Sequence, residues 1–144
     1  MALTQTLCTS FKVSLFDGEM DFSADTNNVF KIALFTSTAS LDATTTAYSS
    51  ANEVSGTGYT AGGKTLSIDT NPTSTDTTAY IGFSTVSWPS STITARGALI
   101  YRSSGTGNNA VAVLDFGVDK QTNNSTFTIT FPTADKNTAI IRIA

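Results

Sequence analysis

The chain has 144 residues, which is most simply one domain, and it contains 27 Thr and 17 Ser but no His. Only 13% of the residues are charged, the net charge is −3 and the basic residues are scattered, so the composition disfavours binding to nucleic acid or to an anionic membrane surface. The absence of His removes the commonest general base and the commonest metal ligand, and a single Cys, Cys8, excludes an internal disulfide.

The first predicted element, within residues 7–22, fits two patterns. Leu7, Phe11 and Leu15 recur at every fourth position, as on one face of a helix, whereas apolar residues in the same stretch also alternate as in a strand. Polar residues that can cap a helix precede Phe11, and a glycine that can end one follows it, so we favour a short helix.

Residues 29–36 (VFKIALFT) predict a strand that is apolar on both faces, which indicates a central strand covered from two sides. Residues 37–63 are mostly small and polar and end in a glycine-rich stretch, so they predict a long loop region. A loop of that length inside a compact domain is unusual and tends to be functional. We therefore consider residues 37–63 a candidate contact surface.

The second half of the chain predicts a series of short strands separated by turns. Strands are expected at residues 64–69, 78–86, 93–102, 110–116, 126–131 and 138–143, and turns at residues 71–72, 103–109, 118–124 and 132–136. Residues 88–89, Trp-Pro, are expected to close the strand before them. Gly97, in the middle of a strand, indicates a bulge or a close approach of two backbones.

This pattern predicts the fold class and the domain organisation. Seven to eight short strands without a long helix are typical of an all-β protein, an antiparallel β-sandwich or jelly roll, here with a short N-terminal helix. We expect one β-sandwich domain at residues 28–144, preceded by an N-terminal arm or short helix at residues 1–27.

One acidic cluster was considered as a metal site. Alternating carboxylates can hold Ca²⁺, but the EF-hand loop needs a glycine at its sixth position, where this chain has Phe22. We interpret the cluster as a solvated acidic turn and expect no metal ligand in it; its members are Asp17, Glu19, Asp21 and Asp25.

An enzyme is not expected. A Ser or Cys nucleophile without His would have to use Lys as its base, and no Ser-x-x-Lys pair occurs in the chain. A glycosidase needs two carboxylates on facing walls of a cleft, and nothing in the sequence selects a pair from Asp69, Asp115 and Asp119. We therefore predict no catalytic residue and no cofactor.

The composition favours binding or assembly instead. A surface of hydroxyl groups with few long charged side chains loses little rotamer entropy when another molecule covers it. Aromatic residues suit an interface or a sugar groove, although Trp88 fits the core equally well. The candidate interface residues are Leu7, Phe11, Leu15, Phe16, Tyr48, Tyr59 and Trp88.

Several segments together resemble a family of small structural proteins of tailed bacteriophages. The resemblance covers most of the chain from about residue 28, whereas residues 1–27 fit less distinctly. The segments that carry it are FKIALFTSTASLDATTTAY (30–48), NEVSGT (52–57), GYTAGGKTLS (58–67), ITARGALIYRSSG (93–105), AVAVLDFG (110–117) and FTITFPTADKNTAIIRIA (127–144).

The resemblance implies a virion component, and among these a capsid cement or decoration protein. Such a protein would sit on the outer capsid surface of a virion made in a bacterial cytoplasm. It would form a dimer or trimer with itself, bind the major capsid protein and bridge neighbouring shell subunits. We expect residues 1–16 to act as an arm or clasp and residues 37–63 to contact the capsid; a helix packed on its own sandwich remains the alternative for the N-terminal segment.

Two other functions remain open at this stage. The first is a tail or tail-fibre component that binds a host receptor or glycan, which predicts a solvent-facing aromatic patch near Trp88 or Tyr59. The second is a tail-tube or connector subunit, which would assemble into rings.

Overall fold

The computed structural model describes residues 2–23, 28–104 and 107–144. Within them the chain forms ten strands and one short helix, which confirms the predicted all-β class and the N-terminal helix. The elements are β1 (Thr6–Leu7), α1 (Thr9–Phe16), β2 (Phe30–Phe35), β3 (Lys64–Leu66), β4 (Ile68–Thr75), β5 (Thr78–Phe83), β6 (Val86–Ser91), β7 (Thr94–Arg102), β8 (Ala110–Gln121), β9 (Ser125–Ile129) and β10 (Ile141–Ile143). Asp25 of the acidic cluster and residues 105–106 of the predicted 103–109 turn lie outside the described residues.

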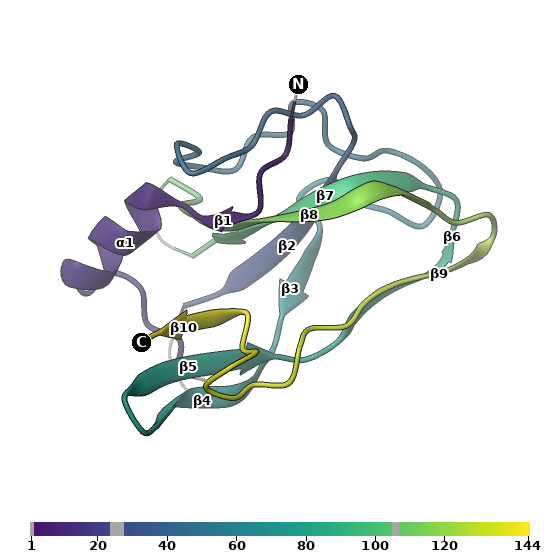
Figure 1. Cartoon of the computed structure of the whole chain (residues 1–144). Helices are drawn as coiled ribbons and strands as arrows, with labels where there is room; N and C mark the ends of the chain where they lie inside the picture. The colour runs from purple at the N-terminus through teal and green to yellow at the C-terminus, as the bar shows by residue number, and fades with distance from the viewer. Residues whose placement is uncertain (1, 24–27, 105–106) are drawn as a thin grey trace.

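The strands form two layers, and every pair of neighbouring strands is antiparallel. One layer is a five-stranded sheet in the order β1-β8-β7-β2-β3. The other consists of a three-stranded sheet, β10-β5-β4, and a two-stranded sheet, β6-β9, and Figure 1 shows it below the first. The strand count exceeds the predicted seven to eight mainly because residues 64–69 and 78–86 each contribute to two strands where the chain passes between sheets.

A single long two-stranded ribbon belongs to both layers. Residues 86–102 pair with residues 110–129 almost without interruption, first as β6 with β9 and then as β7 with β8. At the corner, the Ser91 hydroxyl lies 2.9 Å from the Thr122 hydroxyl, and Thr122 N–H donates to Ile93 O. The predicted turn at residues 118–124 is therefore wrong, because β8 continues to Gln121 and its chain then bends into β9 beside its partner.

Two other predictions that rest on proline are also wrong: the turn at residues 71–72 and the end of a strand at residues 88–89. Pro72 lies inside β4 and Pro89 inside β6. Each proline lies where the pairing register shifts, and β4 and β6 are edge strands of their sheets. An edge strand tolerates proline at such a position, because the N–H group that proline lacks would not have formed a hydrogen bond with a neighbouring strand.

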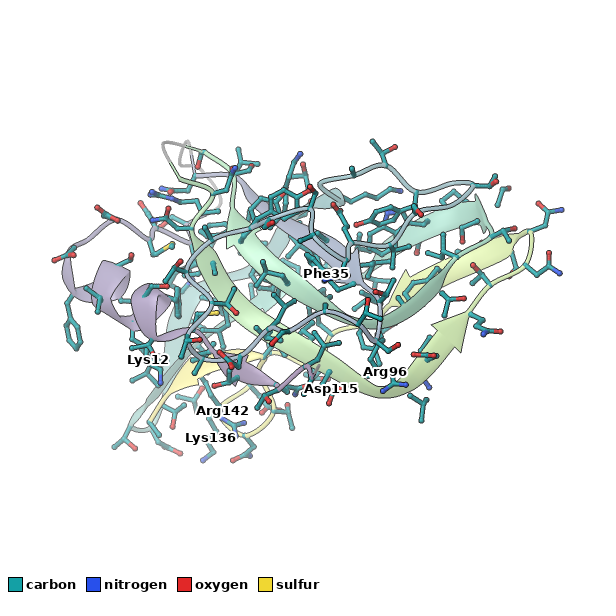
Figure 2. The ribbon with its side chains drawn as sticks, turned by 90° about the horizontal axis from the view of Figure 1, so that it is seen from above. Lys12, Phe35, Arg96, Asp115, Lys136 and Arg142 are labelled. Atoms are coloured by element: carbon teal, nitrogen blue, oxygen red, sulfur yellow. The ribbon has the colours of Figure 1, made fainter. Side chains whose placement is uncertain are left out.

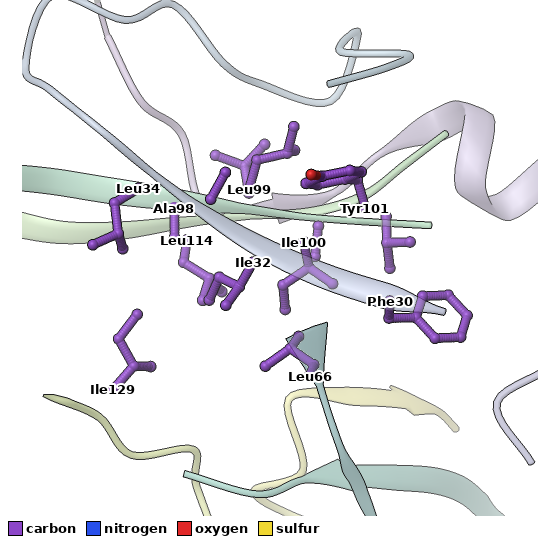
Figure 3. Packing of buried hydrophobic residues seen from close by; sticks show 14 of the residues in the cluster. Phe30, Ile32, Leu34, Leu66, Ala98, Leu99, Ile100, Tyr101, Leu114 and Ile129 are labelled. Atoms are coloured by element: carbon purple, nitrogen blue, oxygen red, sulfur yellow. The ribbon is translucent and has the colours of Figure 1, made fainter. Parts of the chain in front are cut away.

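The core forms one continuous cluster, which lies between the layers and extends to the outer side of the five-stranded sheet, beneath the loop that follows β2. Phe30, Ile32 and Leu34 of β2 alternate with Ala33 and Phe35, and all five are buried. Figure 3 shows Phe30, Ile32 and Leu34 near side chains of the neighbouring strands. In Figure 1 the loop that follows β2 crosses above the sheet, and its Val54 and Ala39 are buried. The prediction of a central strand is confirmed, because β2 pairs with β3 and β7.

Gly97 confirms the predicted close approach of two backbones. The pairing of β7 with β8 shifts register between Ala95 and Gly97, and a Cβ atom at Gly97 would lie 2.3 Å from Leu114 O. Since a Cβ atom cannot lie so close to a backbone oxygen, only glycine fits here without moving β8.

Charged side chains stay at the margin of the molecule. In Figure 2, Lys12, Arg96, Asp115, Lys136 and Arg142 lie along the lower side of the molecule, while Phe35 lies near the centre. Among the described residues, no helix is long and apolar enough to cross a membrane.

Candidate interaction surfaces

The described part of the N-terminal segment is joined to the sandwich. β1 pairs with the edge of β8, and Cys8 N–H, at the start of α1, donates a 2.9 Å hydrogen bond to Val111 O. Phe11 of α1 is fully buried, and its ring meets Phe22 edge-on with centroids 5.8 Å apart. These residues therefore belong to the same core as the strands.

The opposite face of α1 faces solvent and carries two apolar side chains beside Thr9 and Lys12. Val13 is 55% exposed and Phe16 is 93% exposed, the largest exposed fraction among the exposed large hydrophobic side chains of the described residues. Residues three apart share one face of a helix, so the two side chains form one surface, which we call the helix patch. A fully exposed phenylalanine side chain adds almost nothing to the stability of the isolated fold. Its burial against a partner would therefore stabilise the complex.

A groove of about 350 Å³ lies on the other side of α1. Leu15 and Met20 line one wall of this helix groove, and Ile81 and Ile141, from the three-stranded sheet, line the opposite wall. Ile143, at its end, is 58% exposed. The sandwich thus presents apolar surface on both sides of its one described helix.

One carboxylate in the loop at residues 37–63 gathers several hydrogen bonds. Glu53 accepts three hydrogen bonds: from the Tyr48 hydroxyl at 2.6 Å, from the Tyr59 hydroxyl at 2.7 Å and from Gly62 N–H at 2.8 Å. Tyr59 also accepts from Leu34 N–H of β2 at 2.8 Å. The loop is therefore tied both to itself and to the central strand, and we call this set the Glu53 network.

Tyr101 of β7 extends the Glu53 network to the sheet beneath. Its ring stacks on that of Tyr48, with centroids 4.6 Å apart and planes 14° apart, and its hydroxyl donates to Gly62 O at 2.7 Å. Burial, followed by the hydrogen bond to Glu53, raises the pKa of Tyr48 and of Tyr59 well above the usual range. Burial and the nearby Glu53 charge also raise the pKa of Tyr101.

These raised pKa values predict a loss of stability at alkaline pH. A tyrosine ionises near pH 10 in the unfolded chain, but the folded state holds these three neutral, so stability is complete below pH 10 and falls as pH rises further. We expect tyrosinate absorbance to rise in one step with unfolding above pH 10. Tyr59→Phe should weaken this pH dependence; an unchanged dependence would contradict the assignment to the Glu53 network.

The structure separates the predicted interface residues into three groups. Phe11 and Trp88 are buried, at 0% and 1% exposure, and are corrected to core residues. Phe22 packs against the first, and Tyr59 and Phe127 pack against the second. The half-buried group is Leu7, Leu15, Tyr48 and Tyr59, whose two tyrosine hydroxyls bind Glu53. Phe16 alone is fully accessible.

Sequence reasoning missed Val13 and Glu53. Val13 and Phe16 are three residues apart, which places them on one face of the predicted helix. The sequence alone does not indicate that this face is exposed. Glu53 gave a weaker signal, as one of two carboxylates in a loop that also holds two tyrosines and several glycines.

The described residues contain no group of three or more His, Cys, Asp or Glu side chains placed to hold a metal ion. Comparison with protein-family models, with curated proteins and with solved structures finds no match to this chain. The surfaces described above, together with the sequence, are therefore the basis for a functional proposal.

Proposed function

We propose that this protein is a capsid cement protein of a tailed bacteriophage, which binds the outer surface of the assembled head and bridges neighbouring shell subunits. The sequence resemblance described above supports the phage assignment. That resemblance also implies a small β-sandwich, with which the all-β fold agrees. The observation that carries the proposal is the helix patch, an apolar surface on a helix whose opposite face is anchored in the core.

The geometry suits a rigid contact. Phe11 fixes α1 to the sandwich, so Val13 and Phe16 are presented on an ordered helix, and little conformational entropy is lost on binding. Burying Phe16 in a capsid pocket would contribute about 2 kcal/mol. The chain as a whole is rich in Thr and Ser, whose side chains lose less rotamer entropy than Lys or Glu when a partner covers them.

The mechanism is stabilisation by mass action. A protein that binds the assembled shell and not its free subunits shifts the equilibrium toward the shell, by an amount that grows with its free concentration relative to its Kd. No chemical step is needed, in keeping with a protein for which we predict no catalytic residue.

A substitution at Phe16 tests this contact. We expect Phe16→Ser to leave the free energy of unfolding within about 0.5 kcal/mol of the wild type, because the side chain is 93% exposed, and to weaken binding to cement-free heads at least about tenfold. The measurement is co-sedimentation with heads over a range of protein concentrations.

Val118→Ser is the matched control, since Val118 is 56% exposed but lies on β8. It should bind heads as the wild type does. Equal binding by the wild type and Phe16→Ser would show that the helix patch is not part of the interface.

The alternative, a tail or fibre component that binds a glycan, predicts an exposed aromatic patch near Trp88 or Tyr59. Trp88 is 1% exposed, and the hydroxyl of Tyr59 is bound by Glu53. The observed aromatic arrangement thus favours the cement proposal over this alternative.

A further inference from the structure

β9 has one edge that the described residues leave without a partner. It pairs only with β6, and its N–H and C=O groups on the other side form no hydrogen bond within the described part of the chain. Its residues, STFTI, include neither a charge nor a proline, and the extra residues at the register shift with β6 belong to β6, so β9 itself stays regular. Such an edge is a template for one more strand.

The other edges of the described sheets are protected. β4 contains Pro72 and two register shifts, and β8 bulges at Gly117, whose N–H is capped by the Asp115 carboxylate at 2.9 Å. β1, β3 and β10 have three residues or fewer. β6 contains Pro89, and Lys64 donates to Ser87 O. These are the usual means by which sheets avoid unwanted pairing, and β9 has none of them.

A groove of about 480 Å³ runs beside this free edge, between β9 and β8. Its apolar lining comes from Leu114 and Phe116 of β8 and from Phe127, Ile129 and Phe131, and Lys120 also lines it. A strand added to β9 would direct alternate side chains into this groove and the others to solvent. A strand that is apolar on one face and polar on the other would therefore fit beside the groove.

β9 and the residue after it have that alternating pattern. The pattern is the same whether the strand is read from its first residue or from its last. Residues 126–130 read Thr-Phe-Thr-Ile-Thr, with the three threonines exposed and Phe127 and Ile129 buried. In an antiparallel pair centred on Thr128, Thr126 faces Thr130, Phe127 faces Ile129, and Thr128 faces its own counterpart. Thr–Thr and aromatic–aliphatic pairs both stabilise antiparallel sheets, and no like charges meet.

We propose that two copies of this chain form a symmetric dimer through antiparallel pairing of their β9 strands, with Thr128 opposite Thr128 of the second copy. The second copy's β9 then covers the open side of the groove, and its Phe127 and Ile129, on the same face of the joined sheet, continue the inner face of the sandwich. Because each copy uses the same edge, the contact closes after two copies and does not propagate. The dimer goes beyond the proposed capsid function, since it forms in the absence of a capsid.

Sedimentation velocity of the purified full chain at increasing concentration tests the dimer. The wild type should sediment at twice the chain mass of 15.1 kDa. Thr128→Lys and Thr128→Glu, each of which brings like charges together at the axis, should sediment as monomers, and a mixture of the two should recover the dimer. Thr73→Lys, on the proline-containing edge strand β4, is the matched control and should remain dimeric.

Cross-linking provides the second readout. Thr128→Cys should form a disulfide-linked dimer under mild oxidation, because the two positions are opposite each other, whereas Thr73→Cys should not. Native Cys8 is 0% exposed, so the wild type should not cross-link. A monomeric wild type at every concentration, or a Thr128→Lys variant that is folded and dimeric, would overturn the proposal, and neither result bears on capsid binding through the helix patch.

Discussion

Replacing Gly63 with alanine should destabilise the fold by about 3–5 kcal/mol, the sum of a left-handed backbone penalty and a severe overlap. Gly63 has φ +74°, and a Cβ atom there would lie 1.8 Å from Ile32 O and 2.7 Å from the Ala33 Cα. Both contacts are with the backbone of the central strand β2, which cannot move without disturbing its pairing with β7. The measurement is the free energy of unfolding in urea.

Gly18→Ala separates the two contributions to the Gly63 result. Gly18 has nearly the same φ, +73°, but no atom lies within 4 Å of a Cβ built there. Its substitution should therefore show the backbone penalty alone, about 1 kcal/mol. If the two variants lost equal stability, close packing of Gly63 on β2 would not be a determinant of the fold.

Replacing Glu53 with alanine should destabilise the protein by about 3 kcal/mol, because it removes the carboxylate that accepts three hydrogen bonds and leaves their donors unpaired. The loss should be concentrated in the loop at residues 37–63. Amide hydrogen exchange should show Gly62 N–H, which donates to Glu53, losing protection while the amides of β8 keep theirs.

Glu53→Gln is the control for the charge. The amide oxygen can still accept from Tyr59 and Gly62, and the amide nitrogen can donate to the Tyr48 oxygen, so about 1 kcal/mol should be lost. A Glu53→Ala variant as stable as Glu53→Gln would show that the Glu53 network does not hold the loop.

Local sequence patterns were sufficient for the regular strands and insufficient where the chain changes sheets. β2 is recognisable because a strand that is buried on both faces is apolar throughout. β9 is recognisable because a strand that is buried on one face alternates apolar residues with polar ones, here threonines. The prolines of β4 and β6 were mistaken for turns, since nothing local distinguishes a turn from an edge strand with a register shift. The corner between β8 and β9 likewise depends on the partner strand bending beside it.

The candidate surfaces were predictable only in part, for a similar reason. Phe16 was recognised as an interface candidate, but Phe11 and Trp88 have the same apolar character and are buried. Burial depends on what the rest of the chain brings to a residue, and Phe22 and Phe127 are distant in sequence from these two. The Glu53 network gathers residues from a loop and two strands, so no sequence window contains it.

The central claim is that this protein covers the head of a phage particle, and its copy number in purified virions tests that claim most directly. Quantitative mass spectrometry against the major capsid protein gives the ratio. The account predicts a simple whole-number relation to the shell subunit, as symmetric occupation of the capsid lattice requires. A ratio corresponding to a few copies per particle would contradict it and would place the protein in the tail or fibres.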